Sequence, residues 1–82
     1  MAEIKLLIKD RTPVYKQVVD FIESAIISGK FQPGEALPSL NSLAKQLDIS
    51  PETAKKVYGI LTRRGLLESH RGKGFFVRSK TD

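Results

Sequence analysis

Cationic side chains in the C-terminal half of the sequence fall at two places where a polyanion could bind. Lys55 and Lys56 are adjacent in a stretch with helical spacing, and Arg71 and Lys73 flank Gly72 in a glycine-rich turn. Ammonium and guanidinium groups contact phosphates through charge and hydrogen bonds, and they also donate hydrogen bonds to guanine. The chemistry available to these residues is therefore electrostatic and geometric binding of a polyanion.

The net charge of +5 is distributed unevenly along the chain. Residues 1–52 carry six Lys and Arg against seven Asp and Glu, whereas residues 53–82 carry eight against two. A basic half of this kind favours nucleic acid as the partner. No membrane interaction is expected, because no segment pairs a basic face with a large apolar one, and no apolar run approaches the roughly 20 residues of a membrane span.

Residue types that support catalysis or metal binding are sparse. The chain has no cysteine and a single histidine, His70, so neither a thiolate site nor a histidine metal cluster is expected. We interpret His70 as a residue near phosphate rather than as a general base, and we expect no enzyme activity and no cofactor. The lack of cysteine agrees with a reducing compartment, and we expect a cytoplasmic protein.

The two lysines lie in the second of two expected helices that a tight turn joins. Ser39 and Ser50 are the expected N-caps, and Pro51 suits the first position of the second helix. Apolar residues recur at helical spacing at Leu40, Leu43, Ala44 and Leu47, and again at Ala54, Val57, Tyr58 and Leu61. Gly65 supplies the C-terminal stop. This spacing is typical of a helix-turn-helix.

The second helix has a polar, partly cationic face beside its apolar stripe. That face carries Ser50, Glu52, Thr53, Lys55, Lys56 and Thr62. Such a helix can enter a major groove, although an ordinary solvated helix has the same pattern. Its N-terminus presents free N–H groups that suit phosphate. Ser39 begins the helix that normally crosses the DNA backbone, so it is a candidate for a further phosphate contact.

After residue 65 the apolar period changes to two, which predicts a hairpin. The expected strands are residues 66–70 and 75–78, joined by the turn 71–74. Gly72 permits close backbone approach, so the cationic tip can reach a minor groove. We expect one of the two adjacent phenylalanines of the return strand to pack on the helices. The disfavoured alternative is that both form a stacking platform for bases, because so small a domain needs their apolar area in its core.

The remaining segments complete one small domain. Residues 1–11 are interpreted as an arm or short strand that covers the core or, less favoured, dimerises. A first helix is expected with Thr12 as its cap, Pro13 at its first position and an apolar stripe that extends to Ile27. Residues 12–78 then form a winged helix-turn-helix, mainly α, with three helices and a β-hairpin wing. Residues 79–82 are interpreted as the start of a linker.

A set of short motifs covers most of the chain. They are Pro13-Val14-Tyr15-Lys16-Gln17-Val18, Gly29-Lys30-Phe31-Gln32-Pro33-Gly34, Leu37-Pro38-Ser39 with Leu43-Ala44, Ile49-Ser50 with Thr53-Ala54, Val57-Tyr58 with Leu61, Gly65-Leu66 and Gly72-Lys73-Gly74-Phe75-Phe76-Val77. Together they resemble the N-terminal DNA-binding domain of GntR-type bacterial transcription regulators. Any one motif alone would be weak, whereas the combination is specific.

The resemblance implies a homodimer that reads a short palindromic operator in double-stranded DNA. The recognition helix would lie in the major groove and the wing tip in the minor groove. A small-molecule effector would act only through a larger C-terminal domain, which does not follow in this chain. The expected function is operator reading within a transcription repressor or activator; the alternative is a winged helix that serves as a protein-interaction or assembly module.

Two positions depart from the family pattern. The family usually has arginine two residues after the serine of Leu-Pro-Ser and another just after the serine of the turn; this sequence has Asn41 and Pro51 there. Because both arginines commonly contact DNA, sequence readout must depend on other side chains. The candidate DNA-binding residues are Ser39, Asn41, Ser50, Pro51, Glu52, Thr53, Lys55, Lys56, Arg71, Gly72 and Lys73. For Glu52, stabilising the helix dipole is favoured over contacting a cytosine amino group.

Overall fold

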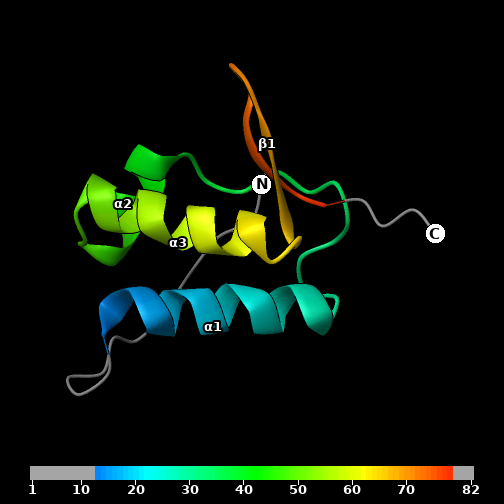
Figure 1. Ribbon diagram of the computed structural model, residues 1–82, viewed down its shortest axis with the longest axis horizontal. Helices are drawn as coiled ribbons and strands as arrows, with labels where there is room; N and C mark the ends of the chain where they lie inside the picture. Colours follow the sequence, from blue (N-terminus) through cyan, green and yellow to red (C-terminus); the bar gives the residue numbers. More distant parts are fainter. Residues whose placement is uncertain (1–12, 79–82) are drawn as a thin grey trace.

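The computed structural model describes residues 13–78. The elements in chain order are α1 (Val14–Ile27), α2 (Leu40–Leu47), α3 (Pro51–Arg63), β1 (Leu67–His70) and β2 (Gly74–Val77). Figure 1 shows α1 and α3 side by side, with α2 at one end of this pair and the hairpin rising at the other. The expected winged helix-turn-helix is confirmed. The expected arm, the Thr12 cap and the linker lie outside the described residues.

Local side-chain chemistry sets the boundaries of α2 and α3. The Ser39 and Ser50 hydroxyls each accept a hydrogen bond, at 3.1 Å, from the backbone N–H three residues later, which confirms both predicted caps. Gly65, with φ of 80°, follows the C-terminus of α3 as predicted. α2 ends at Leu47, and its C-cap is Asp48, whose φ of 55° is left-handed; aspartate tolerates this conformation better than most residues with a side chain.

α1 differs from the prediction in its first residue and in the extent of its apolar stripe. Pro13 is the N-cap rather than the first helical residue, because its ψ of 136° is extended. Ile27 is 72% exposed, so its assignment to the apolar stripe was wrong. It lies two residues after the buried Ala25, which places it about 200° around the helix from the face that packs. The buried part of the stripe is formed by Val18, Val19, Ile22 and Ala25.

One hydrophobic core joins the helices to the base of the wing. Tyr58 on α3 is at its centre: its side chain is buried, and its hydroxyl donates a 2.7 Å hydrogen bond to the Pro38 carbonyl. Its ring lies 4.7 Å, centroid to centroid, from that of Phe75 on β2. Burial raises the pKa of the Tyr58 phenol, which therefore stays neutral. Tyr58 thus links α3 to the segment before α2 and to the wing.

The wing is an antiparallel pair in which Leu67 faces Val77. Both of these residues are buried against the helices, so alternate positions such as Glu68 and Phe76 face outward. β2 begins at Gly74, one residue earlier than predicted, and the turn is correspondingly shorter. Before α2, Ala36 forms a single antiparallel bridge with Phe76 of β2.

Among residues 13–78, no helix is long and apolar enough to cross a membrane, and no group of His, Cys, Asp and Glu side chains could hold a metal ion.

Candidate nucleic-acid interface

The position of α3 is fixed by the buried face of the helix. Ala54, Val57, Tyr58 and Leu61 each have 0% exposed surface. These residues span the helix, so packing determines which side chains point away from the core. The opposite face, which includes Lys55 and Lys56, is exposed.

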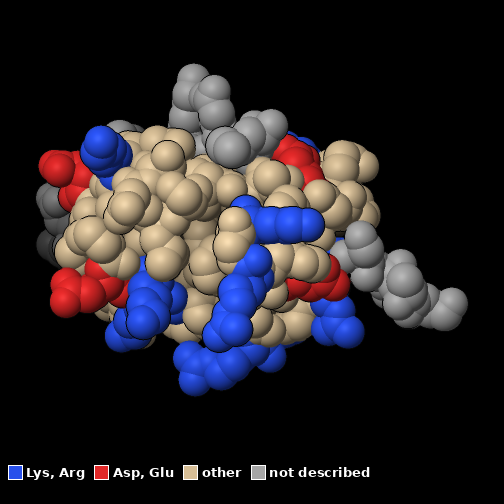
Figure 2. Space-filling view, turned by 90° about the horizontal axis from the view of Figure 1, so that it is seen from above, with Lys and Arg blue, Asp and Glu red and all other residues tan. Residues whose placement is uncertain are grey.

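Cationic residues of α3 and the wing lie at the surface. Those that are exposed are Lys55, Lys56, Arg63, Arg64, Arg71, Lys73 and, just after β2, Arg78. Figure 2 shows that most of the Lys and Arg side chains visible from above gather along one side of the molecule, whereas acidic side chains lie mainly toward its two ends. One side of the domain is therefore electropositive and suited to a polyanion.

The two predicted lysines of α3 have different surroundings. The Lys56 Nζ lies 4.0 Å from the centroid of the Tyr15 ring on α1, a cation–π contact. Lys55 has no partner among the described residues and points about 100° away around the helix. This contact could not be predicted from the sequence, because it depends on how α1 and α3 pack. Lys56 is therefore restrained, and Lys55 is free to extend.

The N-terminus of α3 offers fewer free donors than expected. Pro51 has no N–H, the Thr53 N–H is bonded to the Ser50 hydroxyl, and the Ala54 N–H is bonded to the Ser50 carbonyl. In the described part of the chain, this leaves the Glu52 N–H as the one first-turn donor of α3 without a partner. The Ser50 and Thr53 hydroxyls lie 2.9 Å apart and also bond to each other. Their first role is therefore to hold the helix end.

The start of α2 has one predicted residue in a cap and another free. The Ser39 hydroxyl is occupied by the Ser42 N–H. Asn41 is exposed and has no side-chain partner within residues 13–78. Its amide is therefore available to donate and accept hydrogen bonds at the surface.

The tip of the wing is a tight turn in which glycine is required. Gly72 has φ of 77°, and the Lys73 N–H closes the turn by donating to the His70 carbonyl at 2.9 Å. Arg71 and Lys73 on either side of it are exposed. A residue with a side chain would be strained at this φ, so Gly72 permits a sharp, narrow tip with two cations.

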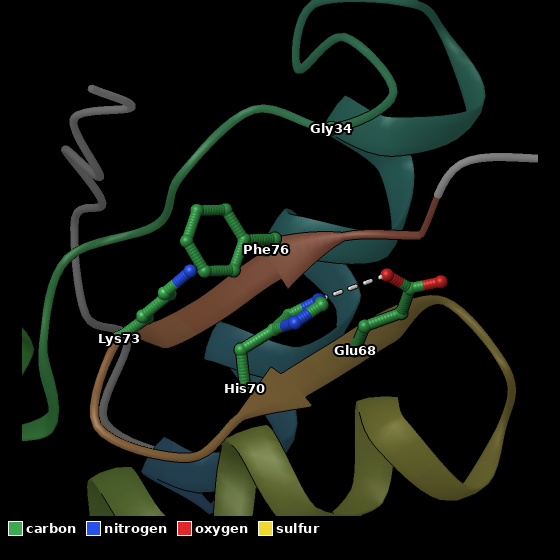
Figure 3. Close-up of a pocket in the computed structure, with 5 residues that line it drawn as sticks. All are labelled: Gly34, Glu68, His70, Lys73 and Phe76. Carbon is green, nitrogen blue, oxygen red and sulfur yellow. Dashed lines mark hydrogen bonds and ion pairs between the residues drawn. The ribbon is translucent and has the colours of Figure 1, made fainter.

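Figure 3 shows a shallow hollow of about 320 Å³ on the outer face of the wing, lined by Gly34, Glu68, His70, Lys73 and Phe76. The His70 Nε2 lies 3.1 Å from the Glu68 carboxylate, and the His70 ring meets Phe76 edge to face at 5.0 Å. Phe76 is therefore the outward phenylalanine. Because Phe75 packs on Tyr58, a stacking platform built from both phenylalanines is ruled out.

The two arginines at the end of α3 differ in the same way as the two lysines. The Arg64 guanidinium forms a 2.5 Å ion pair with Glu23 of α1, and so ties the end of α3 to the first helix. Arg63 is exposed and has no partner among the residues that the structure describes. The sequence alone could not show this difference, because it depends on the packing of α1 against α3.

A comparison with known proteins decides the family. The profile of "Bacterial regulatory proteins, gntR family" matches residues 14–77, which include every helix and strand described above. The chain belongs to the GntR family. Its sequence is 33% identical over 69 residues to the transcriptional repressor YtrA of Bacillus subtilis, a match that covers 84% of this chain and 53% of the repressor.

Two solved structures share the fold of this GntR domain. YtrA from Sulfolobus acidocaldarius, a GntR-family transcription factor, superimposes with a TM-score of 0.84 at 33% identity, covering 95% of this chain and 66% of that one. The DNA-binding domain of AraR in complex with an operator superimposes with a TM-score of 0.81 at 34% identity, covering 94% of this chain and 99% of that one. The chain thus corresponds to a whole DNA-binding domain of one relative, but spans about half of the Bacillus repressor.

Proposed function

We propose that this GntR domain binds double-stranded DNA in a sequence-specific manner. The observation that carries the proposal is the division of α3, whose one face is wholly buried while the other, with the wing tip, carries exposed cations (Figure 2). The structure of the AraR DNA-binding domain with its operator supports the proposal, because that domain has this fold. In this arrangement α3 enters the major groove and the wing enters the adjacent minor groove.

Within the major groove, Lys55 is the principal candidate for base contact. It is exposed, lies one turn into α3 and has no partner among the described side chains. An ammonium group can donate to the O6 and N7 atoms of guanine. Asn41 on α2 is suited to a phosphate or an adenine edge, and Ser39, at the start of that helix, to the DNA backbone. Glu52 stabilises the N-terminus of α3.

The remaining predicted residues assist in other ways. Ser50 and Thr53 hold the N-terminus of α3 in its capped geometry, and Pro51 fixes its first turn. Lys56, restrained by Tyr15, is placed to contact a phosphate at the groove wall. Each such phosphate contact adds affinity and salt dependence but little sequence information.

The whole protein is proposed to act as a homodimer on a palindromic operator in the cytoplasm, without catalytic activity. A two-fold dimer presents two copies of α3 to two half-sites, which is why a palindrome is expected. Regulation by a small-molecule effector would require a further domain beyond residue 82. The names of relatives such as the Bacillus repressor support repression as the direction of control.

Selection of binding sites from random duplexes, at a low and a higher salt concentration, tests this proposal. We expect the 82-residue chain to enrich a defined half-site, and an inverted repeat where two copies bind together. Binding should weaken steeply with salt, with a log–log slope near −4 to −7 for about four to eight phosphate contacts. The Lys55→Glu/Lys56→Glu variant should lose this binding.

Two outcomes would contradict the proposal. If the protein retains duplexes but enriches no particular sequence, its binding is electrostatic and not sequence-specific. If the protein retains no duplex at either salt concentration although circular dichroism shows that it is folded, the alternative of a protein-interaction module is favoured.

A further inference from the structure

Gly59 lies in the middle of α3, at a position where neither the backbone conformation nor the packing requires glycine. It is exposed, and its φ is not in the left-handed region. A Cβ atom built on Gly59 would have nothing within 4 Å. Glycine in an exposed helix interior is less stable than alanine, because it loses more backbone entropy on folding. The isolated domain therefore gains nothing from Gly59, in contrast to Gly65, whose φ of 80° requires glycine.

The surroundings of Gly59 indicate what it does. Glu52, Lys56, Gly59 and Arg63 follow one another at spacings of four, three and four residues, so they form a single exposed stripe along α3. Gly59 thus lies between two cationic side chains, one restrained by Tyr15 and one without a partner in the described part of the chain. Where the stripe lacks a side chain, a polyanion can approach the helix backbone most closely.

We propose that DNA contacts continue along the C-terminal half of α3, with Gly59 as the point of closest approach and Arg63 as a backbone phosphate contact. This inference rests on the proposed function and deepens it. Because Gly59 has no side chain, the wall of the DNA groove can contact the helix surface there. The guanidinium of Arg63, one turn further along α3, can then bind a backbone phosphate. In this proposal, the lower helix stability that glycine causes is offset by closer contact with DNA.

Substitution of Gly59 should therefore change stability and DNA binding in opposite directions. Gly59→Ala should raise the midpoint of thermal unfolding by about 2–8 °C, since alanine favours the helix and has room. The same variant should bind the duplex recovered by selection about tenfold more weakly, because its methyl group occupies the contact. Gly59→Leu should weaken binding further while the domain remains folded.

Arg63 offers a test with a matched neighbour. Arg63→Gln should reduce the log–log salt slope by about one, because one phosphate contact is lost. Arg64→Gln removes the same charge one residue later, but Arg64 is engaged with Glu23. The Arg64→Gln variant should have a lower midpoint of thermal unfolding and an unchanged salt slope. Comparison of the two variants therefore distinguishes loss of a phosphate contact from loss of a positive charge.

Two results would overturn this inference. One is a Gly59→Ala variant that is more stable than the parent and binds the selected duplex equally well. The other is an identical salt slope for the parent, Arg63→Gln and Arg64→Gln proteins. If the parent enriches a sequence and the Lys55→Glu/Lys56→Glu variant does not, these results reject the proposed contact of Gly59 and Arg63 with DNA but not the proposed function. If the parent binds no duplex, the proposed function itself has failed.

Discussion

The exposed face of α3 and the tip of the wing carry similar charges but are held in different ways. α3 is anchored along its length by four side chains with no exposed surface, from Ala54 to Leu61. The wing is anchored by the buried Leu67 and Val77 at its base and by Phe75 against Tyr58, whereas its tip at residues 71–73 is exposed. Side chains on a fixed helix can be matched to particular bases, whereas an extended tip suits contacts that tolerate adjustment.

This difference implies a division of labour between the two regions. Base contacts specify sequence, and phosphate or groove-width contacts mainly add affinity. We therefore expect sequence preference to be determined by α3, with Lys55 as its principal donor, and the wing to contribute affinity that depends little on sequence.

The largest effect should come from reversing a charge on α3. Lys55→Glu should weaken binding to the selected duplex roughly 100-fold, about 2.7 kcal/mol, because it removes a donor and places a carboxylate against the groove. Lys30→Glu, an exposed lysine in the loop after α1, makes the same charge change away from both regions. A comparable loss in the Lys30 variant would mean that net charge, and not the position of Lys55, determines affinity.

Neutralising the wing should have a smaller and more uniform effect. Arg71→Ala/Lys73→Ala is expected to weaken specific and mismatched duplexes alike, by about tenfold, and to reduce the salt slope by about two. Fluorescence anisotropy titrations at several salt concentrations measure both quantities. A loss confined to the specific duplex would contradict the division between the regions.

Substitutions of Tyr15 test whether its contact with Lys56 positions that lysine for DNA binding. Tyr15→Leu should lower affinity about threefold, since an exposed cation–π contact contributes about 0.5–1 kcal/mol, and Tyr15→Phe should retain binding because the ring remains. In a Lys56→Ala background, Tyr15→Leu should have no further effect. An equal loss in both backgrounds would show that Tyr15 acts independently of Lys56.

The smallest effect on DNA binding is expected from the core. Tyr58→Phe removes the hydrogen bond to the Pro38 carbonyl and should reduce the free energy of unfolding by about 1 kcal/mol, because that buried acceptor loses its donor. Urea unfolding measures this change. Affinity at 25 °C should stay near that of the parent, since Phe still fills the core; a loss approaching that of Lys55→Glu would link recognition to the core hydrogen bond.

Features with a local cause were predictable from the sequence. The caps at Ser39 and Ser50 and the stop at Gly65 depend on a few adjacent residues, and each is present as expected. The apolar spacing of α2 and α3 was predictable for the same reason. Together these signals were sufficient for the fold.

Features that depend on packing between distant segments were not predictable. Periodicity gave α1 an apolar stripe but not its end, so the 72% exposure of Ile27 was missed. The engagement of Lys56 by Tyr15 and of Arg64 by Glu23 depends on the packing of α1 against α3. These contacts distinguish the restrained cations from the free ones, and therefore change which residues are expected to read DNA.

The most direct test of the division of labour is to repeat the selection from random duplexes with three proteins: the parent chain, Lys55→Ala and Arg71→Ala/Lys73→Ala. We predict that the wing variant enriches the same sequence as the parent with lower recovery, whereas Lys55→Ala relaxes or changes the preference at one position of the half-site. A changed sequence from the wing variant, together with an unchanged one from Lys55→Ala, would contradict the account.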